Sequence, residues 1–153
     1  MDTSRLYALR EDNDITQIEL GEAFGCTKHA ISKWEKGIAV IPLRKLNMYA
    51  NYFNVSMDYL LKLSNAKTSS TNIVELDKVL IGKRLRSIRK HYQLSLSNFA
   101  DMLNTTESTI WAYEKGKTLI LTAFAYQLCK EFNISMDYLC GRLDRNRAIT
   151  KIK

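Results

Sequence analysis

Hydrophobic residues recur along the chain with the spacing of short amphipathic helices, and polar residues separate them. No segment shows the sustained alternation of apolar and polar residues that a half-buried strand requires. Residues that cap helices, such as Ser, Thr and Asp, precede many of the short apolar runs. The pattern therefore predicts an all-α protein.

The pattern occurs twice. The sequence Trp-Glu-Lys-Gly at 34–37 is matched by Tyr-Glu-Lys-Gly at 113–116, an offset of 79 residues, and residues 54–60 are matched by 133–139 at the same offset. Over 56 positions the two copies align without a gap, and 16 positions are identical. Such regularity indicates two equivalent domains. We expect a first domain at 1–64, a linker at 65–75, a second domain at 76–141 and a basic C-terminal tail at 142–153.

The connection between the copies is rich in small polar residues, from Ser64 to Asn72. This composition is typical of a flexible linker.

Each copy is expected to contain five short helices. Thr16 and Glu19 have the spacing of a capping box at the start of the second helix, and Thr27 caps the third. Gly37 ends the third helix, and Pro42 suits the first turn of the fourth. The remaining expected caps and stops are Ser56 in the first copy and Asp77, Ser95, Thr106, Gly116 and Ser135 in the second.

The second and third helices of each copy have the pattern of a helix-turn-helix. Two helices that meet at a sharp angle need a small residue at their contact, and Gly21 and Ala100 occupy that position. The turn needs a residue that tolerates a positive φ, and Gly25 is replaced there by Asn104. The residues expected to be buried are Leu20, Phe24, Ile31 and Trp34, and Phe99, Leu103, Ile110 and Tyr113.

These residues resemble a known family. The runs 16–21, 31–37 and 57–60, with the turn glycine, are similar to the Cro and phage-repressor helix-turn-helix, also called the xenobiotic-response-element (XRE) type. The resemblance covers about four fifths of the chain. It implies two five-helix, lambda-repressor-like helix-turn-helix bundles in tandem, whose third helices enter the DNA major groove. It also implies structural ion pairs between Arg10 and Glu35 and between Arg89 and Glu114.

In the first copy, the expected DNA-binding residues lie on the third helix and at the start of the second. The lysines can donate to guanine or phosphate, and His29 can donate to a base or phosphate. Gln17 matches a position that the family uses for DNA contact. The full set is Gln17, Thr27, Lys28, His29, Ser32, Lys33 and Lys36.

The second copy departs from this pattern, because Leu96 replaces the glutamine and Trp111 stands on the reading face. Glu107 can accept a hydrogen bond from cytosine, and Trp111 can contact thymine methyl groups. Trp111 can equally anchor a protein partner, which would make this copy an interaction or dimerisation module. The expected site residues are Thr106, Glu107, Ser108, Trp111, Lys115 and Lys117.

The charge of +7 is carried entirely by the second half of the chain. Residues 1–66 hold eight basic and eight acidic side chains, whereas residues 67–153 hold fifteen and eight. This excess favours a polyanionic partner such as nucleic acid. Four basic residues of the second copy's first helix, Arg84, Arg86, Arg89 and Lys90, make its electrostatics suit DNA better than its reading face does.

Other classes of function find no support. His29 and His91 fall at different places in their repeats, and no metal-ligating cluster or glycine-rich phosphate loop is present. We therefore expect neither an enzyme nor a cofactor or metal. No apolar run is long enough to span a bilayer, and the three cysteines show no paired spacing, so a cytoplasmic, nucleoid-associated protein is expected. The expected function is a transcription regulator, a repressor that binds double-stranded DNA.

Overall fold

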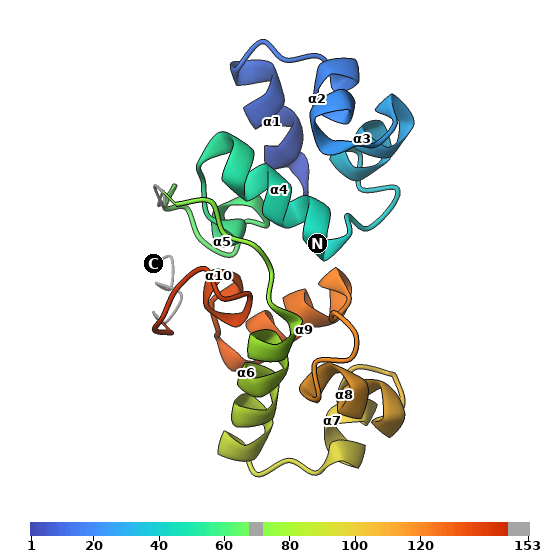
Figure 1. The fold of residues 1–153 in the computed structure, drawn as a ribbon, viewed down its shortest axis with the longest axis vertical. Helices are drawn as coiled ribbons and strands as arrows, with labels where there is room; N and C mark the ends of the chain where they lie inside the picture. The colour runs from blue at the N-terminus through green and yellow to red at the C-terminus, as the bar shows by residue number, and fades with distance from the viewer. Residues whose placement is uncertain (68–71, 147–153) are drawn as a thin grey trace. The chain divides into compact units, whose positions relative to one another are not determined.

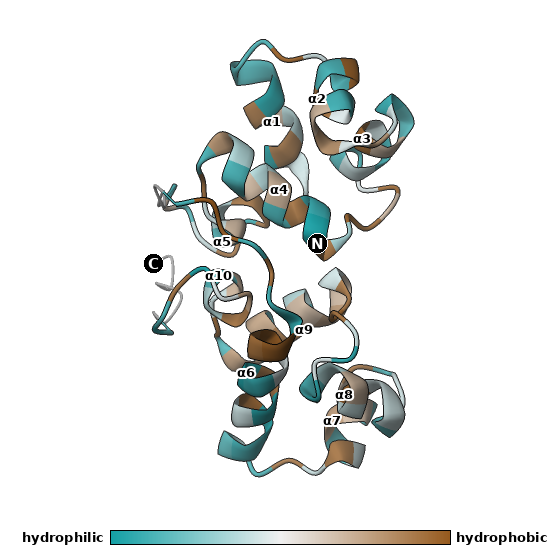
Figure 2. Ribbon diagram, in the orientation of Figure 1, coloured by the Kyte–Doolittle hydropathy of each residue, from teal (hydrophilic) through white to brown (hydrophobic). Residues whose placement is uncertain are grey.

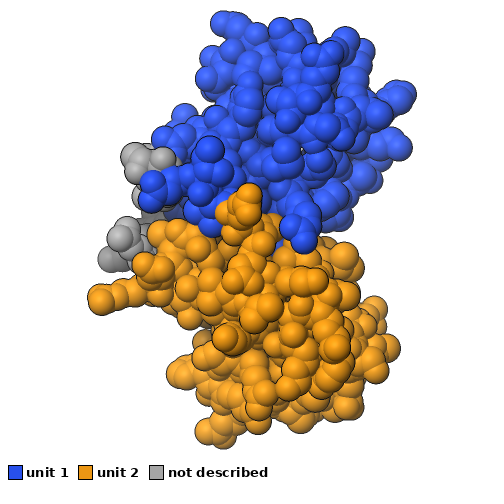
Figure 3. All heavy atoms as spheres, in the orientation of Figure 1, with its two compact units in different colours: residues 1–74, 149–153 blue, residues 75–148 orange. Residues whose placement is uncertain are grey.

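The computed structural model describes residues 1–67 and 72–146, and all regular elements within these two stretches are α-helices (Figure 1). The all-α expectation is thus confirmed. The chain divides into two compact units, and the division falls between Val74 and Glu75 (Figure 3).

The described part of each unit consists of five helices in the same order. The first unit contains α1 (Ser4–Asp12), α2 (Gln17–Phe24), α3 (Lys28–Glu35), α4 (Leu43–Phe53) and α5 (Met57–Leu60). The described part of the second unit contains α6 (Lys78–His91), α7 (Leu96–Met102), α8 (Glu107–Glu114), α9 (Thr122–Phe132) and α10 (Met136–Leu139).

The expected caps are present at the helix ends. Thr16 Oγ1 accepts a hydrogen bond from the backbone N–H of Glu19 at 3.1 Å, and the Glu19 carboxylate accepts from the N–H of Thr16 at 2.7 Å. Thr27 caps α3 in the same way. Pro42 differs from the expectation by one position. It precedes α4 with an extended ψ of 145°, and only its carbonyl takes part in the helix, accepting from the N–H of Leu46 at 2.9 Å.

The backbone repeats as closely as the sequence does. Gly25 has a φ of +62° and Asn104 a φ of +52°, as the turn requires. Every other described residue with a positive φ also has its counterpart 79 positions away; these pairs are Asp14 and Gln93, Gly37 and Gly116, Asn54 and Asn133, and Lys62 and Gly141. Glycine occupies both positions in only one of these five pairs, that of Gly37 and Gly116. The two units therefore follow the same backbone path, although the residue types at these positions are only partly the same.

Each unit has a hydrophobic core of its own, built from the inward faces of its helices. Apolar and polar residues alternate around each helix, as the colours along the ribbon show (Figure 2). The fully buried side chains of the first unit include Leu6, Leu20, Ile31, Leu46 and Leu60. Their buried counterparts in the second unit are Leu85, Phe99, Ile110, Ala125 and Leu139.

One contact between the first and third helices differs between the two units. In the first unit the Thr3 hydroxyl donates to the carbonyl of Trp34 at 2.8 Å. The counterpart of Thr3 is Gly82, where an added Cβ would lie only 2.7 Å from the carbonyl oxygen of Glu114. A hydrogen bond in one copy is thus replaced by direct backbone approach in the other, which only glycine permits.

Both ends of the expected linker are bound to the first unit. Arg5 donates to the Ser64 carbonyl at 2.6 Å and to Asn65 Oδ1 at 2.5 Å. Val74 is hydrogen-bonded to Asn47 and Asn51 of α4. At these two ends the linker is therefore bound and is not a flexible connector. Residues 68–71 lie outside the described residues.

The expected basic tail begins later than residue 142. Arg142 Nε lies 3.2 Å from Asp137 Oδ1, and both side chains are buried. Arg142 is thus part of the second unit rather than a solvated tail residue. The rest of the expected tail from residue 147 onward lies outside the described residues.

Candidate nucleic-acid interface

Helix α3 has one buried face and one exposed face. Ile31 and Trp34 pack into the first unit with 0% and 7% of their surfaces exposed, and Glu35 is buried beside them. The opposite face carries the expected reading residues. Thr27, Lys28, His29, Lys33 and Lys36 are exposed, and Ser32 is half-buried.

A bidentate ion pair joins α1 to the end of α3. Arg10 Nε lies 2.6 Å from Glu35 Oε1 and a second Arg10 nitrogen lies 3.1 Å from Oε2. The same guanidinium donates to the carbonyl of Ile15 at 2.7 Å, in the loop before α2. The hydrogen bond with Glu35 raises the pKa of Arg10, against the opposing effect of burial. One side chain thus connects α1, the following loop and α3.

Gln17 also takes part in this network. Its Nε2 donates to Glu35 Oε2 at 2.9 Å, and its side chain is partly buried. The structure therefore places Gln17 at the start of α2, as expected, but assigns its amide an internal contact. This bond is not evident from the sequence, because Gln17 and Glu35 lie 18 positions apart on different helices.

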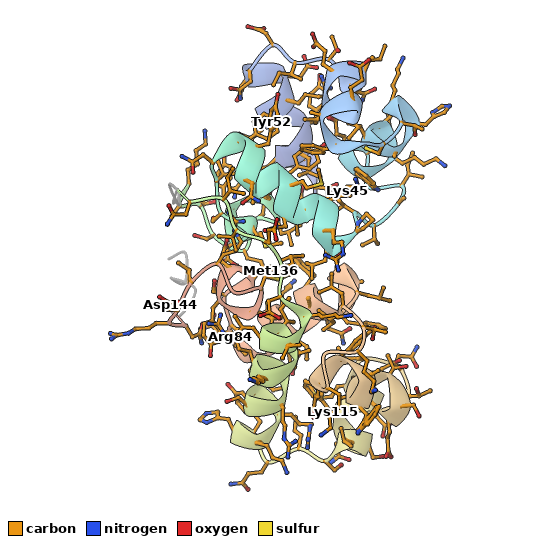
Figure 4. All side chains as sticks on the ribbon, in the orientation of Figure 1. Lys45, Tyr52, Arg84, Lys115, Met136 and Asp144 are labelled. Carbon is orange, nitrogen blue, oxygen red and sulfur yellow. The ribbon has the colours of Figure 1, made fainter. Side chains whose placement is uncertain are left out.

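The angle between α2 and α3 depends on two glycines. A Cβ on Gly21 would lie 2.7 Å from the carbonyl oxygen of Cys26, so the helices approach too closely for a larger residue. Gly25 ends α2 in the left-handed conformation. Lys45, labelled on α4 in Figure 4, donates to the carbonyl of Phe24 at the same turn. Lys45 was not among the expected site residues. Its position in the first turn of α4 was the only indication that the sequence offered.

The second unit repeats this ion pair between α6 and the end of α8. Arg89 Nε lies 2.6 Å from Glu114 Oε1, and a second nitrogen lies 3.0 Å from Oε2. Arg89 also donates to the Leu94 carbonyl at 2.9 Å. These contacts match those of Arg10 atom for atom, and the pKa of Arg89 is likewise raised by its partner. Leu96 stands in the place of Gln17, so no amide reaches Glu114 from that position.

The exposed face of α8 has a different chemistry. Its expected residues Thr106, Glu107, Ser108, Trp111, Lys115 and Lys117 are all exposed. Trp111 has 44% of its surface in solvent, and the Lys117 ammonium lies 5.4 Å from the centre of its ring. This distance is suitable for a cation–π contact. The face thus combines a carboxylate at its start with a large exposed aromatic ring.

Two of the four basic residues of α6 that were expected to favour DNA are engaged inside the second unit. Arg84, labelled in Figure 4, donates to the carbonyls of Tyr138 and Leu143 and lies 4.3 Å from the centre of the Tyr138 ring. Arg89 is held by its ion pair. Of the four basic residues expected to favour DNA, Arg86 and Lys90 are the exposed ones.

The described residues hold no group of three or more His, Cys, Asp or Glu side chains that could bind a metal ion. Among the described helices, none is both long and apolar enough to cross a membrane.

Two compact five-helix units, each with a helix-turn-helix whose second member presents a solvent-exposed face, define the class of this chain. Family models described as a helix-turn-helix and as a helix-turn-helix domain match residues 6–60 and 82–141. The chain carries two helix-turn-helix domains of the Cro and phage-repressor (XRE) type in tandem. Such domains are found in DNA-binding regulators of transcription, which are typically not enzymes.

One curated relative shares part of this sequence. Antitoxin PezA from Streptococcus pneumoniae serotype 4 (strain ATCC BAA-334 / TIGR4) is 30% identical over 62 residues. The match covers 40% of this chain and 39% of the antitoxin, so the chain aligns with less than half of that protein. No solved structure matches the chain.

Proposed function

We propose that the chain is a sequence-specific repressor of transcription that inserts α3 into the major groove of double-stranded DNA. The observation that supports this most is the division of α3 into two faces. Ile31, Trp34 and Glu35 hold the helix against the unit, so the opposite face is presented at a fixed angle. A rigidly supported helix with polar side chains on its outer face is what major-groove reading requires.

Each residue of this face has a chemical role in the proposal. Lys28 and Lys33 donate to guanine edges or phosphates, and His29 and Ser32 form hydrogen bonds with bases. Thr27 and Lys36, at the two ends of α3, contact the backbone. Gln17 supports α3 through Glu35 and faces the DNA backbone at the start of α2.

The two units together would bind two half-sites. In a dimer of single-domain repressors, the half-site centres are about 34–36 Å apart on one face of the duplex. Here the covalent connection raises the local concentration of the second unit once the first is bound. When both units occupy a promoter, they block transcription sterically. In this proposal the protein acts in the cytoplasm, at the nucleoid.

The test begins with selection of bound sequences from random duplex DNA, followed by fluorescence anisotropy on the selected site. Lys28→Ala with Lys33→Ala is expected to weaken specific binding about 10- to 100-fold, the loss of one to two base contacts. Lys62→Ala with Lys67→Ala removes the same charge away from α3 and serves as the control. Binding that is insensitive to Lys28 and Lys33, with no dependence on salt, would exclude this function.

A second candidate function concerns the second unit alone. Trp111 is an exposed aromatic anchor on the face where the first unit has Ser32, and tryptophan is a frequent hot spot of protein interfaces. Similarity to a protein named an antitoxin is in keeping with a protein partner. In this alternative the first unit binds DNA, while the second binds a partner protein or a second copy of the chain.

Trp111→Ala distinguishes the two candidates. If the second unit reads DNA, the variant loses affinity for the selected composite site and keeps its molar mass in light scattering. If the second unit is an interaction module, DNA affinity stays within about twofold while a dimer or a partner complex dissociates. Tyr92→Ala, which removes another exposed aromatic residue of the same unit, is the matched control.

A further inference from the structure

Helix α4 of the first unit binds the backbone of the chain just before the second unit begins. Asn47 Nδ2 and Asn51 Nδ2 both donate to the carbonyl oxygen of Val74, at 2.8 Å and 2.9 Å. Asn51 Oδ1 in turn accepts from the N–H of Val74 at 3.3 Å. The Asn51 carboxamide therefore pairs with both polar groups of one residue, as a neighbouring strand would.

These contacts recognise the backbone and not the side chains. Ile73 has 81% of its surface exposed, so its side chain is not the anchor. Asn47 and Asn51 are four residues apart and thus share one face of α4. Asn47 is 6% exposed, so removal of its amide would leave the bonded carbonyl with a weaker partner in a poorly solvated site.

The two asparagines occur in the first copy only. The positions that correspond to Asn47 and Asn51 are occupied by Tyr126 and Lys130 in α9. There the Lys130 ammonium lies 5.6 Å from the centre of the Tyr126 ring. The two asparagines are therefore not needed to build this kind of five-helix unit, and their effect falls on the connection.

Docking of Val74 leaves a very short connection. The next fixed point is Asp77, whose side chain caps α6 by accepting from the N–H groups of Val79 and Leu80 at 2.9 Å and 3.2 Å. Only Glu75 and Leu76 lie between, and three residue steps span at most about 11 Å. Release of Val74 would lengthen this connection, because its anchor would move back to an earlier residue of the chain.

We propose that Asn47 and Asn51 determine which spacing of two DNA half-sites the chain accepts. By docking Val74 they shorten the free connection and so limit how far the second unit can move from the first. This inference rests on the proposed function in one respect, that both units contact DNA. The limit on movement itself does not depend on DNA.

The limit on movement can be measured on the full chain without DNA. Glu22→Cys and Asp101→Cys, exposed and equivalent positions in the two units, carry spin labels in a Cys26→Ser background. Asn47→Ala with Asn51→Ala is expected to broaden the distance distribution at least twofold. Val74→Ala keeps the bonded backbone groups and should match the parent, whereas Val74→Pro lacks the N–H and should broaden it.

Lys130→Ala, at the position equivalent to Asn51, is the control for a change on the same helix face. Circular dichroism and thermal unfolding show whether the asparagine variants keep their helices. An unchanged distance distribution in a folded Asn47→Ala, Asn51→Ala chain would overturn the proposal.

The second measurement uses duplexes in which the two selected half-sites are separated by increasing spacers. The parent chain should lose at least tenfold in affinity when the best spacer is lengthened by about half a helical turn, whereas the double asparagine variant should lose less than about threefold. A broadened distribution with an unchanged spacing profile would overturn the role in spacing and leave the DNA-binding function intact. Equal affinity of the parent for one half-site and for two would contradict DNA contact by the second unit, and the spacing role with it.

Discussion

At the scale of single residues, each unit contains a buried ion pair that joins its first and third helices. Two opposite charges gain little from burial unless their geometry is good and their remaining hydrogen-bonding groups are satisfied. Arg10 and Glu35 meet both conditions through two mutual hydrogen bonds and one to the carbonyl of Ile15. Removal of Glu35 would leave the buried Arg10 guanidinium with the exposed carboxylate of Glu11, 2.8 Å away, as its remaining counter-charge.

Glu35→Ala should therefore lower the free energy of unfolding by about 3–5 kcal/mol. Arg10→Met with Glu35→Leu should cost clearly less, because no unpaired charge remains. Urea denaturation followed by circular dichroism measures both. Glu114→Ala is the matched variant in the second unit, where Leu96 replaces Gln17 and Lys90 replaces Glu11 beside the ion pair. A double variant less stable than the single one would contradict this account.

The capping box at the start of α2 predicts a dependence on pH. The hydrogen bond from the backbone N–H of Thr16 lowers the pKa of Glu19. A carboxyl group whose pKa is lower in the folded state stabilises the protein above its unfolded pKa, about 4.3, and this stabilisation is lost as the pH falls through the folded pKa. The melting temperature of Glu19→Gln should therefore approach that of the parent as the pH falls from 6 to 2. A constant difference between the two would contradict the prediction.

At the scale of the elements, the turn between α2 and α3 shows which property of a residue matters. Gly25 and Asn104 occupy the same left-handed position with φ values of 62° and 52°. Nothing lies within 4 Å of a Cβ built on Gly25, so a substitution there meets no steric obstacle beyond its own backbone. The conformation of the turn, and not the space around it, selects the residue.

Gly25→Ala should consequently destabilise the chain by about 1–2 kcal/mol, the cost of the left-handed conformation for an ordinary residue. Gly25→Asn should cost less than half of that, as the second copy already uses asparagine. Thermal unfolding of the two variants side by side is sufficient. An Asn variant as unstable as the Ala variant would show that a contact, rather than the φ angle, governs this turn.

The elements were predictable from the sequence because their signals are local. A few neighbouring positions are enough to recognise caps such as Thr16 and Thr27, and a turn residue such as Asn104. The contacts that the sequence did not reveal join residues far apart, such as the bonds of Gln17 to Glu35 and of Asn47 to Val74. No periodicity marks such pairs, since each is a polar residue that a solvated surface would accept equally well. For the same reason the sequence did not show that Arg84 and Arg89 are engaged inside the second unit.

At the scale of the whole molecule, two separate cores predict two separable unfolding events. Each unit buries its own set of apolar side chains, and each contains its own anchoring ion pair. A chain of two units with similar stability can unfold in one apparent transition, even when the units are independent. Destabilising one of them should reveal the second event.

Glu35→Ala is expected to split the urea unfolding curve into two transitions, of which only the earlier moves relative to the parent. Trp34 and Trp111, one in each unit, allow the two events to be assigned by fluorescence after replacement of either by Phe. Glu114→Ala should shift the other transition instead. A single transition that moves as a whole in both variants would show that the units unfold as one.

The exposed faces of α3 and α8 carry a consequence for how such a chain can change. The capping threonines Thr27 and Thr106 are the same in both, whereas Lys28 has become Glu107 and Ser32 has become Trp111. These differing side chains lie in solvent or at its margin. Of the residues that hold the helix in place, Ile31 and Glu35 are repeated as Ile110 and Glu114, and Trp34 is replaced by another buried aromatic residue, Tyr113. In this architecture, recognition is therefore modular. Exchange of a few outward-facing side chains can change the ligand, while the buried contacts that stabilise the bundle stay in place.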